Sequence, residues 1–240
     1  MDEPHARGTL YIVSTPIGNL DDMTLRGVKV LQSVDLIAAE DTRTSGILLR
    51  HFEIHKPMVS YFSHNETRRA DQLVKRMQAG TNVALITDAG TPGISDPAHV
   101  VIREAIANGI PVVPIPGANA VLPALVASGL PSDRFVFEGF LPLKKGRQTR
   151  WKALLEEERT IIIYESPQRI VKALEEILLH LGDREIAVAR ELTKKFEEVL
   201  RGPVSGVLQR VRSREPRGEY VIVIAGTAYK SERVEETDVE

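Results

Sequence analysis

The chain has 240 residues, of which 42% are hydrophobic and 27% are charged, a composition typical of a globular protein with a sizeable core. It contains no cysteine, which excludes disulfides, thiolate nucleophiles and cysteine-ligated zinc. The formal net charge is −2, yet the last ten residues hold five acids and one arginine, so the rest of the chain is mildly basic. No apolar run approaches membrane-spanning length and the amino terminus lacks a signal-peptide pattern, so we expect a cytoplasmic protein without a membrane segment.

Short apolar runs alternate with amphipathic segments in the first half of the chain. The runs predict buried strands at 10–13, 36–39, 59–62, 83–86 and 112–115. Apolar residues at helical spacing predict crossover helices at 24–34 and 65–79, and a helix of small residues at 118–128.

The second half repeats this alternation after Gly129 and Pro131. Strands are predicted at 134–140, 160–164, 185–189, 197–201 and 219–225, with helices at 167–181 and 203–212. The pattern predicts an α/β fold made of two α/β domains with a cleft between them. We expect one domain at 8–117, a second at 118–227, and an acidic, disordered tail at 228–240.

The loop DAGTPGISDP, Asp88 to Pro97, follows the predicted strand 83–86 directly. Gly90 and Gly93 would let a ligand approach the backbone, the prolines would stiffen the loop, and its hydroxyls and carboxylates offer polar contacts. The loop therefore favours ligand binding. An ordinary strand-to-helix turn, with Ser95 or Asp96 as the helix cap and Pro97 at the first helical position, remains open.

Two further loops lie at the carboxyl ends of predicted strands. STPIGNL, Ser14 to Leu20, follows the first strand, and PGANA, Pro116 to Ala120, enters the helix at 118–128 or serves as a plain helix start. Ligands of open α/β sheets bind at this edge. The chain has neither the dinucleotide glycine fingerprint nor a phosphate loop, which argues against nicotinamide and nucleoside-triphosphate chemistry.

These loops, in this order, resemble the tetrapyrrole methylase superfamily, whose members bind S-adenosylmethionine between two α/β domains. A closer similarity is to the bacterial small-subunit ribosomal RNA methyltransferase I family, which methylates the ribose 2′-hydroxyl of a cytidine in 16S rRNA. The residues that carry it are STPIGNL, AEDTR (39–43), DAGTPGISDP, PGANA, GFLP (139–142), YESPQR (164–169) and ARELTKKFEE (189–198).

The resemblance implies S-adenosylmethionine as cofactor and assigns residues to it. They come from the three loops above and from two later segments: Pro16, Ala89, Gly90, Thr91, Ile94, Asn119, Ala120, Tyr164 and Leu192. A cationic sulfonium with a neutral adenine prefers carbonyl oxygens, apolar walls and few fixed positive charges, which such loops provide.

Methyl transfer to a ribose oxygen depends mainly on alignment and exclusion of water, but a carboxylate near the hydroxyl would help to remove its proton. Asp41, Glu165 and Glu191 are the candidates for that role. We predict that Asp41 and Arg43 position the nucleotide, since a carboxylate and a guanidinium can grip ribose and phosphate. A capped helix start with a structural ion pair remains the alternative for this pair.

The segment 144–152, KKGRQTRWK, has five basic residues and no acid. Lys144, Lys145, Arg147, Arg150 and Lys152 are therefore the predicted RNA contacts, with Trp151 available to stack on a base. We expect a mobile loop, with a solvated helix start as the alternative. Arginines and lysines at 68, 69, 75 and 76, and arginines at 210–217, could extend the basic surface.

The six histidines show no metal-binding spacing, so we expect no metal. The expected partners are 16S rRNA or the small ribosomal subunit, and the resemblance implies a homodimer. Two other functions stay open: a methylase of a small tetrapyrrole or corrinoid, and a catalytically silent RNA-binding assembly protein. The basic segment favours an RNA substrate over a tetrapyrrole.

Overall fold

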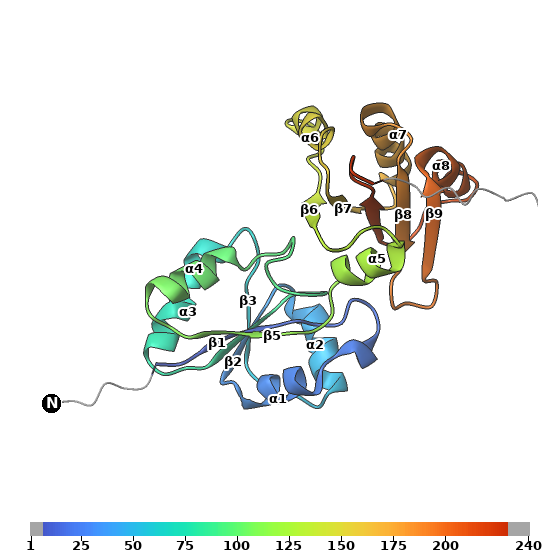
Figure 1. Cartoon of the computed structure of the whole chain (residues 1–240). Helices are drawn as coiled ribbons and strands as arrows, with labels where there is room; N and C mark the ends of the chain where they lie inside the picture. Colours follow the sequence, from blue (N-terminus) through green and yellow to red (C-terminus); the bar gives the residue numbers. More distant parts are fainter. Residues whose placement is uncertain (1–6, 230–240) are drawn as a thin grey trace, which may run out of the picture. The chain divides into compact units, whose positions relative to one another are not determined.

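The structure is a computed structural model that describes residues 7–229 (Figure 1). The chain divides into two compact units, Met1–Ala120 and Val121–Glu240. The acidic tail expected from residue 228 lies almost wholly outside the described residues. Each unit has its own sheet, and the predicted α/β fold is confirmed.

The first unit contains a five-stranded sheet in the order β3-β2-β4-β1-β5, and all four pairings are parallel. Its strands are β1 (Leu10–Val13), β2 (Leu36–Ala39), β3 (Met58–Ser60), β4 (Val83–Ile86) and β5 (Val112–Ile115). Strands β2 and β4 are buried at every position, as expected for parallel strands covered on both faces.

Helices cover both faces of this sheet (Figure 1). A short 3-10 turn (Leu20–Asp22) precedes α1 (Leu25–Ser33), and α2 (Thr42–His51) follows β2; these two helices share one apolar cluster with the sheet. On the other face α3 (Glu66–Gln78) and α4 (His99–Ala107) pack on a second cluster. The predicted crossover helices correspond to α1 and α3.

Local capping explains where two of these helices begin. The Thr24 hydroxyl accepts a hydrogen bond from the Gly27 N–H at the start of α1, and Asp41 does the same for Arg43 at the start of α2. The alternative in which Ser95 or Asp96 caps the helix after DAGTPGISDP is wrong. Helix α4 begins at His99 after Ala98, so the loop from Asp88 is longer than an ordinary turn.

The second unit holds a mixed sheet in the order β6-β7-β10-β8-β9, in which only β6 and β7 are parallel. Its strands are β6 (Phe135–Phe140), β7 (Thr160–Glu165), β8 (Glu185–Arg190), β9 (Glu198–Pro203) and β10 (Tyr220–Ile224). Its helices are α5 (Val121–Ser128), α6 (Arg147–Leu154), α7 (Ile170–Leu181) and α8 (Val204–Arg212). The core of this unit joins α6, α7 and α8 to the sheet, while α5 packs against β8 and β10.

The basic segment 144–152 is helical from Arg147 onward, so the alternative of a helix start describes it better than a mobile loop. Helix α6 begins at Arg147, after Gly146 at a φ of 88°, a left-handed conformation that glycine adopts without strain. Trp151 is 0% exposed and lies in the core, so the expectation that it stacks on a base is wrong.

Among residues 7–229 no helix is long and apolar enough to cross a membrane, and no group of three or more His, Asp or Glu could hold a metal ion.

Candidate active site

Two of the predicted ligand loops lie side by side at the carboxyl edge of the first sheet. The backbone N–H of Thr15 donates to the carbonyl of Gly90 at 2.9 Å, and the N–H of Gly90 donates to the carbonyl of Thr15 at 3.0 Å. Gly90 makes these two bonds with a φ of 88°, a backbone conformation that would be strained for a residue with a side chain. Pro16 and Gly90 are thereby held on adjacent loops.

The third loop joins the same edge through hydroxyl groups. The Ser14 and Thr91 hydroxyls are 2.8 Å apart, and the Thr91 hydroxyl donates to the carbonyl of Ala118 at 3.3 Å. Gly117 lies so close to Ser14 that a Cβ at position 117 would be 2.9 Å from the Ser14 Cβ. All the cofactor positions predicted in the first unit therefore belong to three connected loops: Pro16, Ala89, Gly90, Thr91, Ile94, Asn119 and Ala120.

Carboxylates line the neighbouring strand ends. The Asp41 N–H donates to the Asp88 carboxylate at 3.2 Å. Burial raises the pKa of Glu40 and of Asp88, and burial together with the nearby Glu40 raises the pKa of Asp96 to about 7. This part of the edge supplies oxygen ligands and negative charge, which suits a cationic ligand.

Asp41 and Arg43 form an ion pair beside these carboxylates. The Arg43 guanidinium lies 2.7 Å from the Asp41 carboxylate, and the Asp41 side chain also caps α2. Hydrogen bonds from Arg43 lower the pKa of Asp41 to about 2. The capped-helix alternative thus describes this pair, but the Arg43 side chain is 89% exposed and retains room to contact a ligand.

Glu165, the third predicted catalytic residue, is enclosed in the second unit. Its carboxylate is 1% exposed and lies 2.7 Å from Arg169 Nε and 4.0 Å from the Arg147 guanidinium. Arg147 in turn donates to Glu176 at 2.7 Å and to the carbonyl of Pro142. These four side chains, Glu165, Arg169, Arg147 and Glu176, form what we call the buried ion network, which favours a structural role for Glu165.

Aromatic residues surround Tyr164, the predicted cofactor position on β7. The Tyr164 ring meets Phe137 and Phe140 edge to face, with ring centroids 5.0 and 5.5 Å away. Arg169 lies over the Phe140 ring at 5.9 Å. Leu192, the other predicted cofactor position of this unit, is buried. Its neighbours in sequence, Glu191 and Thr193, both have positive φ and make a tight turn after β8.

The structure separates the five predicted RNA contacts into two groups. Lys144, Lys145 and Lys152 are exposed. Arg150 is half-exposed, and its Nε and Nη2 donate to the two carboxylate oxygens of Glu138. Arg147 is only 6% exposed and belongs to the buried ion network. The lysines are therefore the positive charges that this segment offers to solvent.

The sequence interpretation missed Arg169, Phe140 and Glu176. Arg169 lies four residues after Glu165, at the turn between β7 and α7, and pairs with it at 2.7 Å. Glu176 carried no local signal, because its partner Arg147 is 29 residues away.

Comparisons with known proteins define the class. Residues 9–208 match the family model of the tetrapyrrole (corrin/porphyrin) methylases. The structure resembles uroporphyrin-III-C-methyltransferase from Thermus thermophilus, with a TM-score of 0.65 and 19% identity over 92% of this chain and 96% of that one. It also resembles a diphthine synthase, with a TM-score of 0.70 and 15% identity over 91% and 90% of the two chains. The fold is thus that of the tetrapyrrole methylases.

Sequence relatives narrow the class. A Synechocystis protein named ribosomal RNA small subunit methyltransferase I is 51% identical over 91% of this chain and 79% of the relative. Proteins of the same name from Escherichia coli O157:H7 and Thermotoga maritima are 50% and 43% identical, over 92% and 91% of this chain and 79% and 99% of the relatives. The chain belongs to the ribosomal RNA small subunit methyltransferase I family.

Proposed function

We propose that the protein transfers a methyl group from S-adenosylmethionine to the ribose 2′-hydroxyl of a cytidine in 16S rRNA. The observation that carries the proposal is the 51% identity, over 91% of the chain, to a relative named ribosomal RNA small subunit methyltransferase I. The three connected loops at the carboxyl edge of the first sheet support it, because ligands of open α/β sheets bind there.

The residues at this edge fit S-adenosylmethionine. Gly90 takes a φ of 88°, which lets the loop turn back to pair with Thr15, and the surrounding donors and acceptors are hydroxyls, carbonyls and carboxylates that tolerate a sulfonium cation. When bound, the cofactor supplies an electrophilic methyl group. The residues proposed to hold it are Pro16, Ala89, Gly90, Thr91, Ile94, Asn119 and Ala120 of the first unit, and Tyr164 and Leu192 of the second.

Asp41 and Arg43 are proposed to position the target nucleotide. A carboxylate whose pKa is about 2 is ionised at neutral pH but is a weak base, so Asp41 is suited to accept a hydrogen bond from the ribose hydroxyl rather than to take its proton fully. The exposed Arg43 guanidinium offers paired donors to a phosphate. Alignment and exclusion of water then supply most of the acceleration.

Glu165 is proposed to act through its neighbours. Its buried carboxylate faces Arg169 and Arg147, so it has no exposed oxygen with which to contact a ribose. We assign it a positioning role, in which it holds Arg169 beside Phe140. The RNA contacts that remain are Lys144, Lys145 and Lys152, with Arg150 available if its pair with Glu138 opens.

The proposal includes a homodimer, which the resemblance implied. Leu122 and Val126 on α5 are 50% and 72% exposed and lie one helical turn apart, so they form an apolar strip suited to a protein contact. Light scattering of the purified protein tests this, with Val126→Asp as the disrupting variant. A monomeric mass for the unaltered protein contradicts it. The proposed substrate agrees with the expected cytoplasmic location.

The central experiment uses small ribosomal subunits from cells that lack the gene. The purified protein and S-adenosylmethionine carrying a labelled methyl group are added, and the 16S rRNA is digested and examined by mass spectrometry. We expect label on the ribose of one cytidine. The double variant Asp41→Ala/Arg43→Ala should transfer much less label to that ribose than the unaltered protein does. Label on a base or on no RNA contradicts the proposal. Label on a tetrapyrrole favours a small-molecule methylase, and RNA binding without transfer favours an assembly protein.

A further inference from the structure

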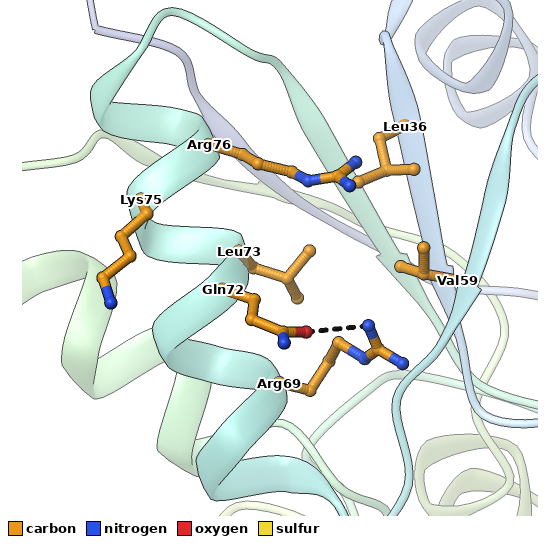
Figure 2. A pocket seen from close by; sticks show the side chains of 7 residues that line it. All are labelled: Leu36, Val59, Arg69, Gln72, Leu73, Lys75 and Arg76. Atoms are coloured by element: carbon orange, nitrogen blue, oxygen red, sulfur yellow. Dashed lines mark hydrogen bonds between the residues drawn. The ribbon is translucent and has the colours of Figure 1, made fainter.

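A groove of about 420 Å³ runs along the outer edge of the first sheet, between α3 and the strands β2 and β3 (Figure 2). Leu36, Val59 and Leu73 form its apolar floor. Its other lining residues all come from α3: Arg69, Gln72, Lys75 and Arg76. We call this feature the α3 groove.

Two arginines give the α3 groove its charge. Figure 2 shows Arg69 and Arg76 extending from α3 toward β3 and β2, whereas Lys75 points away from the floor. Lys75 is neutralised by Asp71 at 2.8 Å. Arg69 donates to the uncharged Gln72 at 2.8 Å, and within residues 7–229 no ion pair joins Arg69 or Arg76 to a carboxylate. The groove therefore carries two guanidinium charges that the protein itself does not neutralise.

The direction of α3 relates the groove to the candidate active site. Helix α3 connects β3 to β4, which belong to one parallel sheet, so it runs back from the carboxyl edge toward the amino edge. Arg69, in the first turn of α3, is therefore nearer the edge that carries the ligand loops than Arg76 is. Seven residues of helix separate them by roughly 10 Å, so the groove forms an elongated basic track.

We propose that the α3 groove binds the phosphate backbone of the RNA substrate outside the target nucleotide, an inference that rests on the proposed function. Unpaired guanidinium groups bind phosphates through charge-assisted hydrogen bonds. The apolar floor between them suits the sugar portion of the strand. Such contacts position an RNA without reading its sequence, so the groove adds affinity and register rather than specificity for a base.

The test compares Arg69→Gln/Arg76→Gln with a matched pair, Arg26→Gln/Lys29→Gln, that also removes two positive charges. Arg26 and Lys29 are exposed on α1, on the opposite face of the same sheet. Binding of a 16S rRNA fragment is measured at several salt concentrations. Losing two phosphate contacts should reduce the slope of log K against log salt by about 1.4 to 1.8. We expect the dissociation constant at low salt to rise by about tenfold in the groove variant only.

Further measurements distinguish phosphate binding in the groove from a general loss of charge or of folding. In the groove variant, KM for RNA should rise while kcat at saturating RNA, the affinity for S-adenosylmethionine and the thermal unfolding midpoint stay unchanged. Arg69→Lys/Arg76→Lys should restore most of the salt dependence, since it restores the charges. Equal effects in the α1 control variant, or an unchanged salt slope in the groove variant, overturn the proposal. If the unaltered protein binds no RNA, the proposed function itself fails and the groove proposal falls with it.

Discussion

The hydroxyl groups of Ser14 and Thr91 lie 2.8 Å apart, although the two residues are 77 positions apart in the chain. Ser14 follows β1 and Thr91 follows β4, which are neighbours in the parallel sheet. Because Thr91 also donates to the carbonyl of Ala118, one hydroxyl connects three loops. The candidate cofactor site in the first unit depends on this connection.

Replacing Thr91 by valine removes the connecting hydroxyl but keeps the size of the side chain. The free energy of unfolding should fall by about 1 kcal/mol, the usual net value of such a hydrogen bond. The affinity for S-adenosylmethionine, measured by calorimetry, should fall several-fold because the loops lose their alignment. Thr67→Val, on the exposed side of α3, is the control and should bind the cofactor normally. Normal cofactor binding by Thr91→Val would remove Thr91 from the site.

Gly117→Ala tests the close approach of the third loop to Ser14 in the first loop. A Cβ at this position would lie 2.9 Å from the Ser14 Cβ, so the loop must move. Overpacking of this kind costs about 1–3 kcal/mol, measurable by urea unfolding, and cofactor binding should weaken as well. Gly46→Ala, within α2 and with only the Met58 side chain nearby, should instead stabilise the protein by up to about 1 kcal/mol. Equal stabilities of the two variants would contradict this account.

Arg147→Met tests the buried ion network. It leaves the carboxylates of Glu165 and Glu176 without their shared guanidinium, and breaking a buried pair in this way costs about 3–5 kcal/mol. Adding Glu176→Gln should recover much of that loss, because it removes the buried charge left uncompensated, whereas Glu165 keeps its pair with Arg169. Urea unfolding measures both effects. If Arg147→Met is as stable as the unaltered protein, the buried ion network does not contribute to stability as described.

Replacing the exposed lysines of the basic segment should affect RNA binding and not stability, the opposite of the effect expected for Arg147. Lys144→Gln/Lys145→Gln/Lys152→Gln should leave unfolding nearly unchanged, because surface substitutions of this kind have small effects. The same variant should weaken binding to a 16S rRNA fragment and lower the slope of log K against log salt by roughly 2 to 3. Cofactor affinity serves as the internal control. An unaltered salt slope would exclude this segment from the RNA interface.

The raised pKa of Asp96 should make the stability of the protein depend on pH. Its folded pKa of about 7 lies above the ordinary value of 3.8, so between these pH values the folded state holds a proton that the unfolded state has released. Stability from this group therefore falls as pH rises from about 4 to 7 and then levels off. Glu40 and Asp88, whose pKa values are also raised, act in the same direction.

Thermal unfolding across this pH range, for the unaltered protein and for Asp96→Asn, measures the effect. The variant should show a flatter profile and a higher midpoint above pH 7, since its side chain never ionises. Parallel profiles for the two proteins would mean that Asp96 titrates in its ordinary range.

Much of the fold follows from local sequence. The strands at 10–13, 36–39, 83–86 and 112–115 have the bounds that their apolar runs predict. The first three are central and covered on both faces, whereas the last is an edge strand that is exposed at Val113 and Pro114. Helix α2 was foreseen only as a capped start at Asp41, since the glycine, serine and threonines of TRTSGILLRH lower its helix propensity. Its packing against the sheet stabilises it instead.

The part of the candidate site that depends only on sheet topology could be predicted from the sequence. Loops after neighbouring parallel strands must share an edge, so the sequence could bring Pro16, Gly90 and Thr91 together. Arg147 and Trp151 were interpreted as surface residues because α6 has only eight residues and a high charge. Both side chains are buried and hydrogen-bonded to Glu176, which lies on α7, more than 20 residues further along the chain, and Trp151 also packs in the core of the second unit. Such long-range pairing leaves no trace in local periodicity.

The two backbone hydrogen bonds between Thr15 and Gly90 have a consequence for the kinetics of ligand capture. They hold the first two loops in register independently of any ligand, so entry of a small molecule has little chain to order. For a ligand that binds at this edge we therefore expect a small loss of conformational entropy in these two loops, and an on-rate set by diffusion and charge instead of a slow closing movement of the two loops.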